Sequence, residues 1–355
     1  MIRKILRNRS GIALIITLGI LSLLVSLALE LHRQSRETAI RGGGVKDRLI
    51  LGQMAASAVQ AAMGMLIQDR MESDIDSVQE DWADPEKVRQ ALDELSFERG
   101  EVRCVISDEM ARLQVNALVM FPEGTDSDGA LRLIWERAFT IAVFPYEDLP
   151  EESSPTAIVN SLIDWIDSGE GESITGLSGA ESEYYQSLNP PYSCRNGPLT
   201  HAGELLQVKG VLPELFYGRA DIPGISEFIT VYGAAVSEDR FSYSGKININ
   251  TAEIPVLAAL LPGENQDLAL AIYEYRLENS DGVFIHDLTS PTWYKDVPGF
   301  SDIQIDARLI TTQSDIFRIQ ATAELPGMRY AADVVVEREQ DSKTGVWRCR
   351  ILQWQ

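Results

Sequence analysis

An acidic, glycine-rich stretch near the middle of the 355-residue chain is the strongest candidate for a binding site. Calcium takes about six to eight hard oxygen ligands, often from a flexible loop, so this stretch is a candidate calcium site, although its spacing is not that of an EF-hand. A solvated acidic loop that holds no ion is the alternative. The candidate ligands are Asp164, Asp167, Glu170, Glu172, Glu181 and Glu183.

No catalytic centre stands out elsewhere in the sequence. A glycosidase needs two carboxylates that flank one bond, and nothing singles out such a pair among 53 acidic residues. His32, His201 and His286 are far apart, and no GxSxG, HExxH or phosphate-binding loop occurs. We therefore expect no enzymatic activity and no required cofactor, with calcium as the one structural ion to consider.

The cysteines and the net charge limit the kinds of site and partner that the chain can have. Cys104, Cys194 and Cys349 are too few for a disulfide framework and lack the CxxC spacing of a zinc site. A disulfide between Cys104 and Cys349 is one option, since both fall on predicted strands. The formal charge of −22 repels phosphate backbones, so we expect no nucleic-acid partner.

An apolar segment near the amino terminus determines where the rest of the chain lies relative to a membrane. The 19 residues from Gly11 to Leu29 carry no charge, and as a helix they would rise about 28 Å, close to the hydrocarbon thickness of a bilayer. Basic residues in front of the segment hold the amino terminus in the cytoplasm and send the chain after Glu30 into the periplasm. The sequence therefore predicts a single-pass protein of the bacterial inner membrane. Those basic residues are Arg3, Lys4, Arg7 and Arg9.

Three interpretations of this segment compete. A signal anchor would keep it whole. A secretory signal would be cleaved after Ala28, because Ser26 and Ala28 are small at the −3 and −1 positions, and the mature chain would begin at Leu29. A prepilin leader would be cleaved after Gly11, leaving the apolar helix in place with Ile12 as the first mature residue.

The segments outside the middle of the chain predict one helix on an antiparallel sheet. Apolar residues recur at helical spacing from about Asp47 to Met71, and residues 42–44 are glycines that should interrupt the link to the membrane helix, since each costs about 1 kcal/mol relative to alanine.

The strand pattern comes from both ends of the chain. Residues 101–106 and 112–118 are predicted to form a hairpin, and 317–325, 329–339 and 346–355 a three-stranded meander. Such a sheet requires that the middle of the chain be inserted as a separate body.

Short helices separated by proline, glycine and acidic loops fill this middle. The succession INTA, LLPG, a helix ending in YR, GVF, DL and VPG resembles the helix-hairpin-helix motif, in which a turn such as that at Gly263 offers backbone amides to phosphate. The surrounding acidic residues favour a structural use of these units. A signal-anchored periplasmic DNA-binding protein of this class remains the main alternative function, and a secreted carboxylate hydrolase is a third.

An ordered set of motifs resembles one family. RNRSG followed by IALIITLGILSLL is similar to a prepilin leader, with Ile16 where most pilins have glutamate. Further along, DWID, GAE before a tyrosine pair, NPPY and EL-x-x-V-x-G resemble the inserted helical domain of the K-type minor pseudopilins of type II secretion. The departure at Ile16 is typical of that same subunit.

The resemblance implies an α+β pilin fold and a place at the tip of the pseudopilus, where the protein would support export from the periplasm across the outer membrane. Its partners would be the minor pseudopilins I, J and H and the major pseudopilin, and prepilin peptidase would cleave after Gly11 and methylate Ile12. Calcium would bind in the helical domain. The implied domains are a leader at 1–11, a transmembrane helix at 12–31, the stem and first strands at 32–120, the helical insertion at 121–305 and the last strands at 306–355.

Overall fold

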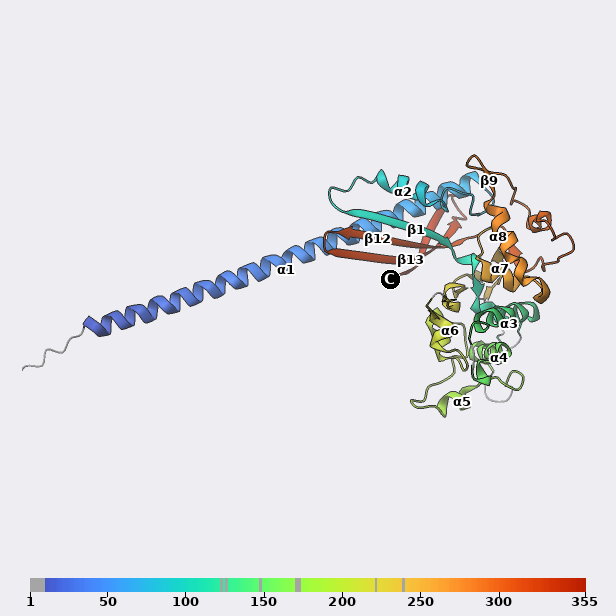
Figure 1. Ribbon diagram of the computed structural model, residues 1–355, viewed down its shortest axis with the longest axis horizontal. Coiled ribbons are helices and arrows are strands. Elements are labelled where there is room, and N and C mark those ends of the chain that lie inside the picture. The colour runs from blue at the N-terminus through green and yellow to red at the C-terminus, as the bar shows by residue number, and fades with distance from the viewer. Residues whose placement is uncertain are drawn as a thin grey trace, which may run out of the picture.

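The computed structural model describes residues 10–355 except 122–123, 125–126, 147–148, 170–173, 221 and 238–239. A long helix, α1 (Ser10–Glu72), projects from a body formed by a sheet and a separate group of short helices (Figure 1). The sheet lies along the far half of α1, and we call the two together the stem body. The helical group lies beyond it, and we call it the head.

Helix α1 is continuous through residues 42–44, so the predicted interruption there is wrong. Glycine weakens a helix but keeps its backbone N–H, so hydrogen bonding can continue where helix is present on both sides. The predicted stem helix lies inside α1, and one face of it, which includes Leu51, Ala55, Ala58 and Leu66, is buried. The segment that precedes it is exposed along its whole apolar length.

Four antiparallel strands form the main sheet in the order β1-β12-β13-β14. The predicted meander is confirmed by the three strands from the end of the chain. Alternate residues of β12, among them Phe317, Ile319 and Ala321, join the hydrophobic cluster under α1. Helix α2 (Pro85–Asp93) packs beside β1. The strand bounds are Glu101–Asp108 for β1, Ile316–Leu325 for β12, Met328–Gln340 for β13 and Trp347–Trp354 for β14.

The predicted hairpin of 101–106 with 112–118 is wrong. Strand β1 pairs with β12 instead, with Glu101 opposite Glu324. Residues 113–119 are buried without alternation, which suits a segment enclosed by the head. There β2 (Leu113–Gln114) pairs in parallel with β5 (Ile229–Thr230).

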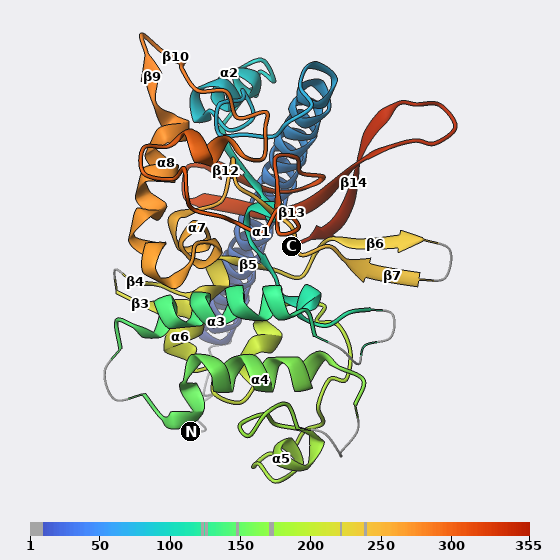
Figure 2. The same cartoon turned by 90° about the vertical axis from the view of Figure 1, so that its right-hand side faces the viewer.

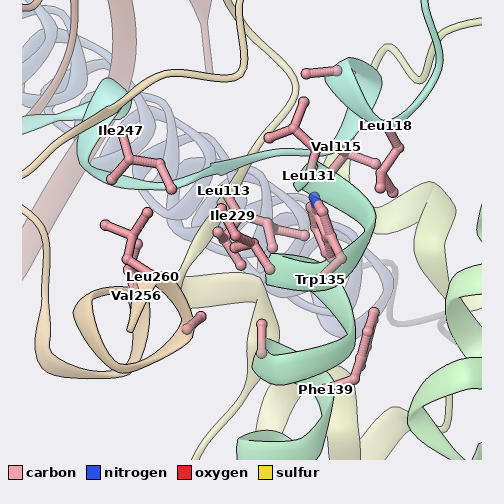
Figure 3. Close-up of a cluster of buried hydrophobic side chains, with 14 of the residues drawn as sticks. Leu113, Val115, Leu118, Leu131, Trp135, Phe139, Ile229, Ile247, Val256 and Leu260 are labelled. Atoms are coloured by element: carbon pink, nitrogen blue, oxygen red, sulfur yellow. The ribbon is translucent and has the colours of Figure 1, made fainter. Parts of the chain in front are cut away.

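The head has its own hydrophobic cluster, which runs from Ala111 to Ile310 and so reaches beyond the predicted boundaries at 121 and 305. Figure 2 shows α3 and α4 side by side in it, and Figure 3 shows Trp135 and Phe139 of α3 among its buried side chains. The helices are α3 (Gly129–Val143), α4 (Pro155–Ile166), α5 (Ser182–Gln186), α6 (Pro213–Tyr217), α7 (Ile254–Leu260) and α8 (Ala269–Leu277). The short strands are β3 (Gly218–Arg219), β4 (Ile222–Pro223), β6 (Ala234–Ser237), β7 (Arg240–Tyr243), β8 (Ile247–Asn248), β9 (Asn279–Ser280), β10 (Val283–Phe284) and β11 (Ile310–Thr311).

The possible disulfide between Cys104 and Cys349 is absent from this structure, where all three cysteines are free. Cys104 lies on β1 and Cys349 on β14, the two edge strands of the sheet. Three strand spacings separate them by at least about 14 Å, whereas a disulfide requires Cα atoms within about 7 Å. Burial raises the pKa of the Cys104 thiol to about 12 and that of Cys349 to about 11.

A buried polar network joins the stem body to the head, and we call it the joint. The Asp108 carboxylate, at the end of β1, accepts hydrogen bonds from Asn248 and Thr251 of the head and from Ser314 of the returning chain. Arg338 of β13 lies beside them and binds Asp76. These six residues connect the two bodies at the two places where the chain passes between them.

Candidate metal centre

The carboxyl end of α4 places two acidic residues close together. Asp164 lies in the last turn of the helix, and Asp167 follows the final residue in an extended conformation that ends it. Negative charge is unfavourable at this end of a helix, where the unpaired carbonyls already carry partial negative charge. The placement therefore favours a cation nearby.

Glu181, at the start of α5, completes a trio with Asp164 and Asp167. One carboxylate oxygen from each lies within 4.8 Å of those from the other two. The three residues are between 0% and 9% exposed. Three carboxylate oxygens at this separation, shielded from water, suit a hard divalent cation such as calcium.

Burial perturbs all three carboxylates. It raises the pKa of Asp167 to about 6 and that of Glu181 to about 7, with mutual repulsion as a further cause, and it also raises the pKa of Asp164. Lys209 lowers the pKa of Asp164 without outweighing burial. The Lys209 ammonium donates its hydrogen bonds to the carbonyls of Ser178 and Gly179.

The unsatisfied atom at this site is Oδ2 of Asp164. Its companion Oδ1 accepts a hydrogen bond of 2.9 Å from the backbone N–H of Thr175. Oδ2 is buried and has no hydrogen-bond partner among the described residues. A buried, unpaired carboxylate oxygen is costly, and a bound cation would remove that cost.

The structure thus brings together three of the six predicted ligands. Glu183 lies exposed on α5 and outside the trio, and Glu170 and Glu172 lie outside the described residues. Metal binding by Asp164, Asp167 and Glu181 stays a prediction.

Gly179 leaves room for the Asp164 carboxylate. A Cβ atom at Gly179 would come within 2.0 Å of Oδ2 of Asp164 and 2.9 Å of Cγ2 of Ile174. We expect Gly179→Ala to displace the carboxylate and to lower the free energy of unfolding by about 1–3 kcal/mol, as overpacking does. Urea unfolding measures this. Gly197→Ala is the control, because the nearest atom to its Cβ would be 3.9 Å away, and equal losses in the two variants would contradict the prediction.

A second acidic group, which no sequence pattern indicated, lies next to the joint. Carboxylate oxygens of Asp69, Asp76 and Glu80 also lie within 4.8 Å of one another. Here Arg338 already supplies positive charge, with its Nη atoms 3.1 Å from Asp69 and 2.6 Å from Asp76. The three acidic residues are close together in the sequence, but Arg338 lies 262 residues after Asp76. No local sequence pattern therefore links the arginine to them.

Comparison with known proteins points to one secretion machinery. A family model described as type II secretion system (T2SS), protein K matches residues 111–218. The type II secretion system protein K of Aeromonas hydrophila is 24% identical over 349 residues, which cover 95% of each chain. The protein of that name from Klebsiella pneumoniae is 25% identical over 72% of each chain.

The fold also matches a solved structure. A chain from the crystal structure of the GspK-GspI-GspJ complex of the enterotoxigenic Escherichia coli type 2 secretion system aligns with a TM-score of 0.60, over 89% of this chain and 98% of that one. At 15% sequence identity this likeness is one of fold, and it confirms the α+β architecture.

Proposed function

The chain belongs to the protein K family of the type II secretion system and is a minor pseudopilin, and we propose that it caps the pseudopilus at its periplasmic tip. The observation that carries the proposal is the position of the head. It lies at the far end of α1 from the apolar segment (Figure 1), so a subunit anchored by that segment presents the head away from the membrane. In this role the protein is structural rather than enzymatic and supports export from the periplasm across the outer membrane.

Helix α1 supplies the anchor. It is long and apolar enough to cross a membrane, with an apolar window of mean hydropathy 2.8. We propose that it crosses the bacterial inner membrane once, with the amino terminus in the cytoplasm and the stem body and head in the periplasm, because the basic residues precede the apolar run. Residues 1–9 of the leader lie outside the described residues.

Processing of the amino terminus tests the proposed function. In cells that make prepilin peptidase, we expect the mature chain to begin at a methylated Ile12, and Gly11→Val to leave the full-length precursor, since the peptidase needs a small residue before the cleaved bond. Mass spectrometry of the purified chain measures both. Gly19→Val is the control within the same helix and should be processed normally.

Two other mature termini would contradict the proposal. A chain that begins at Leu29 would show a cleaved secretory signal, and one that keeps Met1 in the presence of active peptidase would show a simple signal anchor.

We propose the minor pseudopilins I, J and H and the major pseudopilin as partners. The solved complex contains its K, I and J proteins together. On this chain, α1 carries exposed apolar side chains between the apolar segment and the stem body, and Val45 and Leu49 are 71% and 66% exposed there. Such a surface suits packing against neighbouring helices in a filament.

We also propose that the trio of Asp164, Asp167 and Glu181 holds a structural calcium ion. The donors fit, because all are hard oxygens, all are buried, and Oδ2 of Asp164 lacks another partner among the described residues. When bound, the ion would neutralise the three carboxylates and tie the carboxyl end of α4 to the start of α5.

DNA binding is the weaker candidate. The turn between α7 and α8 contains Gly263, but Glu264 follows it directly and Asp267 lies three residues further on. Residues 111–310 hold 30 acidic and 11 basic residues, so the head repels phosphate. Duplex binding at low salt that is lost on substitution at Gly263 would favour this candidate instead.

A further inference from the structure

Two adjoining recesses lie outside the candidate metal centre, the first on the head and the second between the head and β1 of the stem body. The first, the apolar recess, has a volume of about 230 Å³ and is lined by the end of α3, the turn around β4 and the start of α7. Its walls are apolar side chains, which include Ile141, Ala142, Ile222, Phe228 and Val256. The volume is close to that of one large side chain, which is how an anchor residue at an interface is typically held.

The second, the acidic recess, has a volume of about 270 Å³ and shares Phe228 and Val256 with the first. Glu227 and Glu253 lie on its wall and are exposed. Among the described residues, neither carboxylate makes a hydrogen bond or ion pair with another side chain, and the cation that the charge of Glu253 influences, Arg276, is itself buried. Arg112 also lines this recess, but it lies 3.4 Å from Glu109 and is already paired.

We propose that the two recesses together bind a segment of a partner protein that carries a bulky apolar side chain next to a lysine or arginine. The shared wall at Phe228 and Val256 sets the two sites side by side. The apolar side chain would fill the first recess, and the cation would lie against Glu227 and Glu253.

The charge of the head disfavours two other possible occupants of the recesses. A second copy of this chain would bring another head with 30 acidic and 11 basic residues against the first, and like charges oppose that contact. An apolar small molecule would fill the first recess but leave the two carboxylates of the second unused. A segment with an apolar and a basic residue satisfies both.

The test uses the full-length chain in lipid nanodiscs and a displayed library of random heptapeptides. We expect selection to enrich peptides with a bulky apolar residue adjacent to lysine or arginine. Fluorescence anisotropy then measures the affinity of the selected peptides after synthesis. Ala142→Trp, which fills the apolar recess, should weaken binding at least about tenfold. Glu227→Gln combined with Glu253→Gln should weaken it about fivefold at low salt and less at high salt.

Matched variants keep the result interpretable. Leu133→Trp adds the same side chain to an exposed position of α3 outside the recess, and it should bind as the wild type does. Ala142→Met narrows the recess with a smaller change in volume and is measured in parallel, in case tryptophan disturbs the fold. No enrichment, enrichment without the basic residue, or equal affinity for the wild type and both Ala142 variants would overturn the proposal.

Discussion

Replacement of Arg338 by methionine is expected to lower the free energy of unfolding by about 3–5 kcal/mol, because it leaves buried carboxylates without their cation. The Arg338 side chain is fully buried, 2.6 Å from Asp76 and 3.1 Å from Asp69. It also donates to the carbonyls of Leu66 and Ser314 and lies over the ring of Phe317. The guanidinium therefore connects α1, the joint and β13.

The loss should depend on pH. Burial already raises the pKa of Asp69 to about 7 and raises that of Asp76, and Arg338 lowers both. Without the arginine these carboxylates would bind protons more readily in the folded state than in the unfolded state, so acid should offset part of the damage. We expect a larger deficit at pH 8 than at pH 5, measured by urea unfolding of the chain in detergent.

Arg329→Met is the matched control for this prediction. Arg329 lies on the same strand but is exposed, and its ion pair with Glu324 is 3.7 Å long. Exposed pairs contribute at most about 1 kcal/mol. Similar losses in the two variants, or a deficit for Arg338→Met that does not change with pH, would show that the joint does not depend on a buried charge pair.

Removal of calcium is also expected to lower the stability of the head. If the trio binds the ion, calcium at 100 times its Kd should stabilise the head by about 2.7 kcal/mol, and a chelator should abolish that gain. Asp164→Asn changes one of the three ligands and should weaken calcium binding by at least roughly 10–100-fold, the range seen when only a residue that supports a ligand is changed. Isothermal titration measures the affinity, and Glu183→Gln, outside the trio, should leave it unchanged.

The stability of the head should depend on pH in opposite directions with and without the ion. The raised pKa values of Asp167 and Glu181, about 6 and about 7, mean that the ion-free head holds protons more tightly than the unfolded chain does. The contribution of these two groups to the stability of the ion-free head is fully present below their pKa values in the unfolded chain. It is lost as the pH rises through 6 to 7. Calcium needs the ionised carboxylates, so its stabilising effect should be full above about pH 7 and fade as pH falls through the same range. A calcium effect that is constant from pH 5 to pH 8 would contradict the assignment.

Elements that depend on local patterns could be predicted from the sequence. The apolar run after Gly11 indicated a helix long enough to span a membrane. Alternating residues in the last 40 positions gave the meander, because period-two alternation with one buried face specifies both the strands and their inner side. The family motifs gave the overall architecture.

Strand pairing and side-chain contacts between residues far apart in the chain depend on the tertiary structure. Strand β1 and residues 113–118 are close in sequence, yet β1 pairs with β12 because Cys104 and Ile106 bury against α1, while 113–118 is enclosed by the head. The possible disulfide is absent for a related reason. The strand order, which no local pattern encodes, puts Cys104 and Cys349 on opposite edges of the sheet.

The candidate metal centre shows both contributions. The sequence places Asp164 and Asp167 one helical turn apart and supplies the acidic composition. Only the packing of α5 against the end of α4 selects Glu181 and leaves Glu183 exposed. The pairing of Arg338 with Asp76 is likewise absent from any sequence window. Periodicity fixes the direction in which a side chain points from its own element, whereas the side chains it meets depend on how distant elements pack.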